Sequence, residues 1–352
     1  MKEMTFDLKH GAGNPRNSEG AFIPLNNGEI MFAYTKYSGD DWSDNSTADI
    51  AALYSADNGR SWGRFRILVK NPAQNVMSVS LLRLQDGRVA MAYLLKSSIS
   101  GSHAVDCRPM ICFSSDEAET WSEPVDIAGI PPVYLVVNND RMIQLKDGRI
   151  VLPAAYHRYI SNGNTCGYGR GIVLYFFSDD GGKSWQQASE CLYPPSGLTS
   201  GFQEPGVIEL SDGRLMTWIR TNGGCQYTAF SSDRGESWSQ SFPASEFASP
   251  ASPLSMKRHP GTGDLYAVWN DWHPCRSVKF GRESWGRTPL VIARSHDEGR
   301  TWVDHTVLEN DPDCGYCYTA MMFRGDELLL AYCCGGKDCN VLQDLRIRVF
   351  EI

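Results

Sequence analysis

The sequence lacks any long apolar run. No stretch of its 352 residues reaches the length needed to span a bilayer, and the start, MKEMTFDLKHG, has no apolar segment of signal-peptide length. A basic excess is also missing, because 33 Lys and Arg stand against 41 Asp and Glu, a net charge of −8. Nucleic acid and anionic membranes favour a basic face, so we expect neither as a partner. We expect a cytoplasmic protein, or a secreted one if a signal peptide was removed.

A regular cysteine framework is absent as well. The eleven cysteines follow no periodic pattern, and without a signal peptide they are predicted to be reduced thiols. Cys314 and Cys317 have the two-residue spacing of a zinc knuckle. A second matching pair is missing, because Cys333 and Cys334 are adjacent and Cys339 stands alone. We therefore predict no metal site and no cofactor.

Helical periodicity is missing throughout, and a repeat stands in its place. The pattern Ser-x-Asp-x-Gly-x-Ser/Thr-Trp starts at residues 55, 114, 178, 231 and 295, with Ala118 replacing glycine in the second copy. Its Asp can accept hydrogen bonds from its own turn, its Gly permits a positive φ, and its Trp fills space beside the strands. Five copies of one group cannot share one active centre. These boxes are therefore predicted to be structural.

A second repeat lies between the boxes. Apolar runs flank an Asx-Gly turn in LNNGEIMFAY (25–34), LQDGRVAMAY (84–93), LKDGRIVLPA (145–154) and LSDGRLMTWI (210–219), with looser versions at 261–269 and 323–332. A hairpin followed by two strands around a box makes one four-stranded antiparallel blade. The repeats predict an all-β fold, a single six-bladed β-propeller over residues 1–352. We expect MTFDLKH (4–10) to pair with the C-terminal strand and close the last blade.

The innermost strands of a propeller converge on its axis, so their leading ends are predicted to line one pocket. Nine residues before the four clear turn glycines lie Glu19, Ser78, Asn139 and Glu204. In the two looser units the same operation reaches Leu254 and the stretch Tyr316-Cys317-Tyr318. Polar strand ends are common singly, and their convergence on one axis is what indicates a site.

The boxes and hairpins resemble those of the sialidase (neuraminidase) superfamily, also called Asp-box or BNR-repeat proteins, over essentially the whole chain. QEPGVIELSDGRL (203–215) is similar to the family strand whose glutamate polarises a tyrosine nucleophile, which implies that role for Glu204. The nucleophile is implied at Tyr318, with Tyr316 as the alternative because a two-residue period places both on one strand face. The loop SDNSTADIAALYS (43–55) implies Asp44 as acid and base. Its competitors are Asp40, Asp41 and Asp49.

The resemblance also implies how substrate is held. Arg220 and Arg287 match two of the three family arginines that bind the substrate carboxylate. Glu19 stands in place of the first arginine, and Cys333 in place of its supporting glutamate. A second carboxylate about 4 Å from Glu19 would cost about 4 kcal/mol at an effective dielectric near 20. Strict specificity for sialic acid is therefore not expected.

Other polar residues are predicted to complete a remodelled sugar site. Arg16 or Lys36 would offset the charge of Glu19. Trp272 beside His273 would form an aromatic platform with a titratable group. His157 is expected to be a surface or core histidine. The remaining predicted binding residues are Arg16, Lys36, Asn139, Asp140, Arg141, Trp272 and His273.

These residues lead to an expected function, an exo-glycoside hydrolase acting on a terminal acidic or polar sugar. Tyr318 would attack with help from Glu204, and Asp44 would protonate the leaving oxygen and then activate water. Tyrosine is neutral at pH 7, which suits attack on a carbon bearing a carboxylate. Two alternatives remain open, a polysaccharide lyase acting on uronic acids and a carbohydrate-binding propeller without turnover. The expected partner is a glycan or small sugar, and the sequence carries no signal for an oligomeric state.

Overall fold

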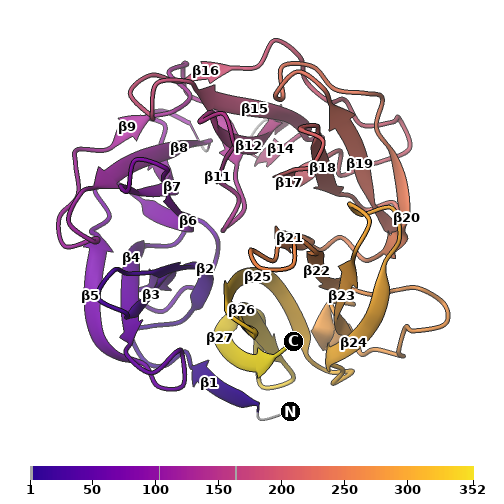
Figure 1. The fold of residues 1–352 in the computed structure, drawn as a ribbon. Coiled ribbons are helices and arrows are strands. Elements are labelled where there is room, and N and C mark those ends of the chain that lie inside the picture. Colours follow the sequence, from indigo (N-terminus) through magenta and orange to yellow (C-terminus); the bar gives the residue numbers. More distant parts are fainter. Residues whose placement is uncertain (1–2, 103, 163–164) are drawn as a thin grey trace.

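The chain folds almost entirely into β-strands, as predicted from its repeats. The computed structural model describes residues 3–102, 104–162 and 165–352. Within these ranges the single helical segment is a 3₁₀ turn, Arg282–Ser284. Figure 1 shows the sheets arranged around a central axis in chain order, from indigo to yellow. Among the described residues no helix is both long enough and apolar enough to cross a membrane.

Three sheets consist of four consecutive antiparallel strands. The first has the order β2-β3-β4-β5, with bounds Asn17–Pro24, Ile30–Tyr37, Ala48–Ser55 and Gly63–Val69. The second is β17-β18-β19-β20, with bounds Gln203–Glu209, Leu215–Arg220, Cys225–Ser231 and Phe242–Ala248. The third is β21-β22-β23-β24, with bounds Ser255–Arg258, Leu265–Asn270, Leu290–Ser295 and Val303–Glu309.

A fourth sheet is larger than predicted, because it has nine strands. Its path is β16-β15-β12-β10-β8-β7-β6, and β11 pairs with β12 and β9 with β8. In chain order the bounds of β6 to β12 are Asn75–Arg83, Val89–Ser98, Val105–Ser114, Val125–Asp126, Tyr134–Val136, Ile143–Gln144 and Ile150–His157, and those of β15 and β16 are Ile172–Ser178 and Gln186–Gln187. Two units merge here because β10 pairs in parallel with β8, through Tyr134 and Cys107. A separate hairpin pairs β13 (Tyr159–Asn162) with β14 (Thr165–Tyr168).

The two ends of the chain meet in one sheet. Its order is β1-β27-β26-β25, with bounds Met4–Leu8, Cys339–Glu351, Glu327–Gly336 and Gly315–Arg324. β1 pairs antiparallel with β27, and Arg346 Nε donates to Asp7 Oδ1 across the pair at 2.7 Å. Phe6 and Leu8 pack against buried residues of this sheet and its neighbour. The N-terminal strand therefore covers the edge that β27 would otherwise expose.

Each box closes on its own backbone. In the first, Asp57 Oδ1 accepts from the Ser61 amide at 2.8 Å, and Ser55 Oγ accepts from the Gly59 amide at 2.8 Å. The Ser61 hydroxyl also donates to the Asp57 carboxylate. The hydrogen bonds that Asp57 accepts, led by this one, lower its pKa to about 2. Gly59 has φ of 83°, and a Cβ there would lie 2.6 Å from Leu329 Cδ2 of another sheet. The same bonds form around Asp116, Asp180, Asp233 and Asp297.

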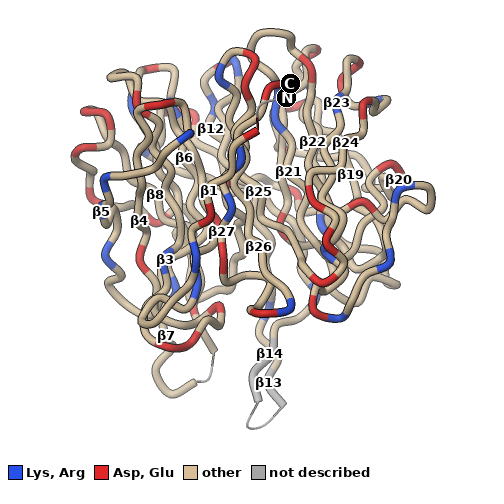
Figure 2. The backbone as a smooth tube through the Cα atoms, turned by 90° about the horizontal axis from the view of Figure 1, so that it is seen from below, with Lys and Arg blue, Asp and Glu red and all other residues tan. Residues whose placement is uncertain are grey.

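The hydrophobic core lies between neighbouring sheets. One cluster, for example, joins Phe32 and Leu53 of the first sheet to Leu329 and Ile347 of the last. β2, β6, β17, β21 and β25 lie nearest the axis, so their ends share one central space (Figure 1). In the side view of Figure 2, Lys and Arg are interspersed with Asp and Glu along the backbone.

Candidate active site

Four innermost strands carry the same irregularity. In β2 the register shifts between Ser18 and Ala21, so that two residues oppose one on β3. Equivalent shifts occur in β6, β17 and β25. The residues with positive φ at these bulges are Glu19 (49°), Ser78 (58°), Glu204 (45°) and Tyr318 (59°). A bulge turns a side chain out of the normal alternation, and all four residues line the central cavity.

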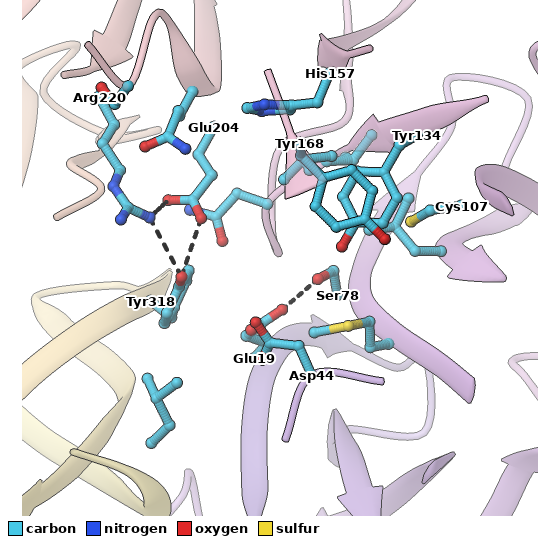
Figure 3. Close-up of a pocket in the computed structure, with 18 of the residues that line it drawn as sticks. Glu19, Asp44, Ser78, Cys107, Tyr134, His157, Tyr168, Glu204, Arg220 and Tyr318 are labelled. Atoms are coloured by element: carbon cyan, nitrogen blue, oxygen red, sulfur yellow. Dashed lines mark hydrogen bonds and ion pairs between the residues drawn. The ribbon is translucent and has the colours of Figure 1, made fainter. Parts of the chain in front are cut away.

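The cavity has a volume of about 520 Å³, and one wall brings together a tyrosine, a glutamate and two arginines. Tyr318 Oη donates to Glu204 Oε1 at 3.0 Å, and Arg220 Nη1 donates to Glu204 Oε2 at 2.7 Å. Figure 3 shows the Arg220 guanidinium and the Glu204 carboxylate side by side, each joined to the Tyr318 hydroxyl group. The Arg287 guanidinium carbon lies 5.5 Å from the centre of the Tyr318 ring. A phenol, a carboxylate and two guanidinium groups therefore face one space.

The tyrosine of this wall is protonated at rest. Burial and the Glu204 carboxylate raise the pKa of Tyr318 well above its usual value, although Arg220 and Arg287 oppose the rise. Glu204 accepts the phenol hydrogen bond, so it is placed to take the proton during an attack. The phenol can therefore become nucleophilic only as it transfers its proton.

The Arg287 guanidinium donates hydrogen bonds to a thiol and to a backbone carbonyl oxygen. Its Nη1 donates to Cys317 Sγ at 2.9 Å, and its Nη2 donates to the Ala251 carbonyl oxygen at 3.4 Å. Burial opposes ionisation of Cys317, but the Cys333 thiol and the Arg287 charge outweigh it and lower the pKa of Cys317. Among the residues that the structure describes, no salt bridge pairs Arg287 with a carboxylate, so the Cys317 sulfur and the Ala251 carbonyl oxygen hold its guanidinium.

The opposite wall places a carboxyl group where the resemblance has an arginine. Arg16 is fully buried, and its Nη2 donates to Glu19 Oε1 at 3.2 Å, while Ser78 Oγ donates to Glu19 Oε2. Burial raises the pKa of Glu19 to about 7 even though Arg16 opposes the rise. Arg16 thus reaches this wall from β2's N-terminal side. Lys36 lies on β3 and does not line the cavity, so its predicted binding role is not supported by its position.

Asp44 faces the cavity from the loop between β3 and β4. Arg16 Nη1 donates to its Oδ1 at 2.6 Å, yet 60% of its side chain is accessible. Partial desolvation raises the pKa of Asp44, but the charges of Arg16 and Lys96 outweigh this and lower it. Its competitors lie outside the cavity lining: Asp41 bonds to Ser43 and Ser46, Asp49 bonds to Lys70, and Asp40 is exposed.

The structure separates the two tyrosines that a strand period would place together. The bulge after Cys317 breaks the alternation, and only Tyr318 lines the central cavity. Tyr316 is buried against Tyr332, with ring centres 6.1 Å apart, and lines a different cavity. Tyr316 is therefore not placed to be the nucleophile.

Asn139, Asp140 and Arg141 join inner strands and do not line the cavity. Asn139 Nδ2 donates to the carbonyl oxygens of Gly20 and Tyr318, at 2.7 and 3.1 Å. The other two side chains bond similarly: Asp140 accepts from Lys257 Nζ and the Met321 amide, and Arg141 donates to Leu254 O and Ser255 Oγ. Their predicted role in binding is corrected to a structural one, because these hydrogen bonds join inner strands and none of the three residues lines the cavity.

Trp272 and His273 also lie outside the lining of the central cavity. Trp272 stacks on Phe280 with ring centres 5.4 Å apart, and its Nε1 donates to the Gly286 carbonyl oxygen at 2.9 Å. Trp272 thus packs within the segment between β22 and β23. The predicted aromatic platform at this place is therefore wrong.

Sequence reasoning missed the aromatic side chains that surround the cavity. Tyr134 and Tyr168 stack with ring centres 3.7 Å apart, and Trp42 and Trp285 are 38% and 46% exposed. Trp42 and Trp285 lie outside the strands, Tyr134 lies on the parallel-paired β10, and Tyr168 ends β14, none of which a repeat marks. Only Trp42 had a signal, because it lies two residues before Asp44.

His157 joins the lining as well. Its Nδ1 must donate to the Gly169 carbonyl oxygen, 2.9 Å away, because a carbonyl only accepts. The lone pair of Nε2 therefore remains available. Burial lowers the pKa of His157, so the ring is neutral at pH 7.

The fold and this pocket define a β-propeller of the sialidase type. The chain belongs to the family of the BNR repeat-like domain, which matches residues 79–330. It is 24% identical to an anhydrosialidase of Macrobdella decora over 59% of this chain and 27% of that protein. It is 26% identical to a sialidase of Paraclostridium sordellii over 59% of this chain and 53% of that protein. The Hadza microbial sialidase Hz136 has a similar fold, with a TM-score of 0.72 and 18% identity, covering 97% of this chain and 66% of that one. The chain therefore spans about a quarter of the first of these two curated relatives (27%) and about half of the second (53%).

Proposed function

We propose that the protein is an exo-glycoside hydrolase of the sialidase superfamily that removes a terminal acidic or polar sugar. The observation that carries the proposal is the 3.0 Å hydrogen bond from Tyr318 Oη to Glu204 Oε1 inside an open cavity. A half-buried tyrosine paired with a carboxylate, each at the bulge of an inner strand, has the geometry of an activated nucleophile. The sialidase relatives support the same chemistry.

The reaction follows from the positions of three side chains. Tyr318 Oη attacks the anomeric carbon while its proton passes to Glu204. Asp44, after it has taken a proton from solvent, gives that proton to the leaving oxygen. A glycosyl-tyrosine results. Asp44 then takes a proton from water, the water oxygen bonds to the anomeric carbon, and the tyrosine leaves with the proton from Glu204. Two displacements retain the configuration.

The charges favour a sugar that is acidic at one end and rich in hydroxyl groups at the other. Arg220 and Arg287 flank Tyr318 and are placed to bind a carboxylate. Glu19 on the far wall is already bonded to Arg16 and Ser78 and is positioned to accept from sugar hydroxyls. Exposed Trp42 and Trp285 offer faces on which a sugar ring can stack.

We also infer that the nine-stranded sheet comprises two blades, which gives six blades in one domain over residues 1–352. The two halves touch through a single parallel pair, whereas every other pairing in the sheet is antiparallel. Each half also carries its own hairpin turn, at Gly87 and Gly148, and its own box.

Replacing the nucleophile tests the proposal. A panel of fluorogenic glycosides that includes the sialyl derivative should reveal a cleaved substrate, and Tyr318→Phe should lower kcat/KM for it by about a thousandfold or more. Tyr316→Phe is the matched control, since its ring lies outside the cavity. Full activity in Tyr318→Phe, with an unchanged melting temperature, would overturn the assignment. Binding without cleavage of any glycoside would indicate a carbohydrate-binding propeller.

A lyase acting on uronic acids is a second candidate, and His157 is the observation that favours it. A neutral imidazole with a free Nε2 lone pair can remove the proton next to a uronate carboxylate. Such a reaction breaks the glycosidic bond by elimination and leaves a carbon–carbon double bond in the product. Ultraviolet absorbance of the unsaturated product, which hydrolysis does not form, distinguishes the elimination from hydrolysis.

A further inference from the structure

A second cavity, of about 460 Å³, lies where the chain leaves β1 and passes β27. Its lining includes the thiols of Cys314, Cys334 and Cys339 together with His10 and Asp344. Among the described residues, one group of metal-ligating side chains has donor atoms within 4.8 Å of one another, and it consists of His10, Cys339 and Asp344. The mechanism proposed above uses none of them.

The three donors form a compact set. Asp344 is buried, and its Oδ1 lies 2.6 Å from His10 Nδ1, while its Oδ2 lies 4.0 Å from Cys339 Sγ. Zinc binds imidazole nitrogen, thiolate and carboxylate oxygen at about 2.0 to 2.3 Å, so its ligands lie within about 4.5 Å of one another. His10 is part-exposed and can close the small remaining difference.

We propose that His10, Cys339 and Asp344 bind a Zn²⁺ ion, with the fourth position open to the cavity. The ion would replace the proton shared by His10 and Asp344 and the proton of the Cys339 thiol. It would fasten the residues after β1 to β27, two segments that are 334 positions apart at His10 and Asp344. Zinc would therefore stabilise the closure of the propeller.

Cys314 and Cys317, which have the two-residue spacing of a zinc knuckle, do not form the proposed site. Cys317 is buried, and its sulfur accepts from Arg287 of the central cavity, whereas Cys314 lines the second cavity. The pair is split between two environments and cannot chelate one ion. Only the tertiary structure brings His10 to Cys339.

Lys9 supplies a sensitive test because it competes for the same carboxylate. Its Nζ lies 3.1 Å from Asp344 Oδ2, and its side chain is 59% exposed. A metal ion would displace this ammonium group. Lys9→Met keeps the aliphatic length, removes the competing charge and should therefore tighten metal binding, which a merely structural role for these residues would not produce.

The experiment is a titration of the metal-free full chain with Co²⁺ in reducing buffer, followed by displacement with Zn²⁺. We expect a thiolate-to-cobalt charge-transfer band with one ion per chain, and a higher melting temperature with Zn²⁺. Cys339→Ser should abolish the band and His10→Gln should weaken binding more than about tenfold. Lys9→Met should strengthen it. Catalytic activity plays no part in this readout, so it stands apart from the proposed hydrolysis.

The control is Cys275→Ser, which removes an exposed thiol beside His273 and should leave the titration unchanged. The proposal is overturned if no band forms, if the band survives in Cys339→Ser, or if it is lost in Cys275→Ser. Weaker binding in Lys9→Met would also overturn it, and this exposed substitution remains informative even if Cys339→Ser does not fold.

Discussion

Glu19 shows how a single side chain can change the preference of a pocket. A carboxyl group that is buried between Arg16 and Ser78 has a pKa of about 7, so it is half-ionised at neutral pH. Below that pH the wall presents a neutral hydrogen-bonding group, and above it the wall presents a negative charge beside Arg16. Binding of an acidic ligand should depend on which form is present.

We predict that affinity for an acidic monosaccharide falls as pH rises from 6 to 8, because Glu19 ionises through its pKa of about 7. The decrease should lie between about twofold and tenfold, or ~0.4–1.4 kcal/mol. In Glu19→Gln this dependence should disappear. Calorimetric titration with a uronic or sialic acid at both pH values measures it, and an equal decrease in both proteins would contradict the assignment.

The same ionisation bears on stability. In the folded protein the pKa of Glu19 lies above the ordinary value of 4.5. The contribution of Glu19 to the free energy of unfolding is therefore fully present below pH 4.5 and is lost as pH rises through about 7. Urea unfolding of the wild type and Glu19→Gln over this window separates the stability effect from the effect on binding.

At the scale of the strand, the bulge is the element that makes the site. In β17 the bulged Glu204 is followed two positions later by Gly206, which lies opposite Trp218 of β18. A Cβ at Gly206 would lie 2.1 Å from the Trp218 ring of the neighbouring strand. The indole therefore covers the backbone immediately behind Glu204, and its place depends on the absence of a side chain.

Gly206→Ala should displace Trp218 and lower the free energy of unfolding by about 1–3 kcal/mol. It should also lower kcat more than Gly63→Ala, because Glu204 depends on the bulge for its direction. Gly63 is the matched control, since its Cβ would meet nothing within 4 Å at the exposed start of β5. Urea unfolding and initial rates measure the two effects. Equal stability of the two variants would show that the indole moves without cost.

At the scale of the whole molecule, the ring depends on the pairing of its two ends. β1 covers β27 over five residue pairs, from Met4–Val349 to Leu8–Leu345, and places Phe6 and Leu8 against the core. Without it the longest strand of the described chain, β27, would have an open edge.

Deletion of residues 1–8 should therefore lower the free energy of unfolding by about 2–5 kcal/mol, since it removes two apolar side chains from the core and the edge hydrogen bonds. The exposed edge should also promote self-association through β27. Urea unfolding and light scattering test the two consequences. An unchanged urea midpoint in a monodisperse deletion variant would show that the ring does not need its closing strand.

Much of this organisation is readable from the residues. The nine-residue interval before a turn glycine locates Glu19, Ser78 and Glu204, because each hairpin keeps the same strand length and bulge. The interval fails by one residue in the third unit, where the positive φ falls on Asp140 and not on Asn139. In the last unit the interval reaches Tyr316, and the two-residue period that would place Tyr316 and Tyr318 on one face is broken by the bulge after Cys317.

The local sequence determines the strands, the box turns and the all-β class, because these depend on neighbouring residues: alternation, Asx-Gly turns and an Asp that bonds within its own loop. The tertiary structure alone decided that Arg16 lies between Glu19 and Asp44, that β10 joins two units, and that aromatic loops surround the cavity. Those contacts link residues distant along the chain, and their geometry is set by how whole sheets pack around the axis, which no local pattern records.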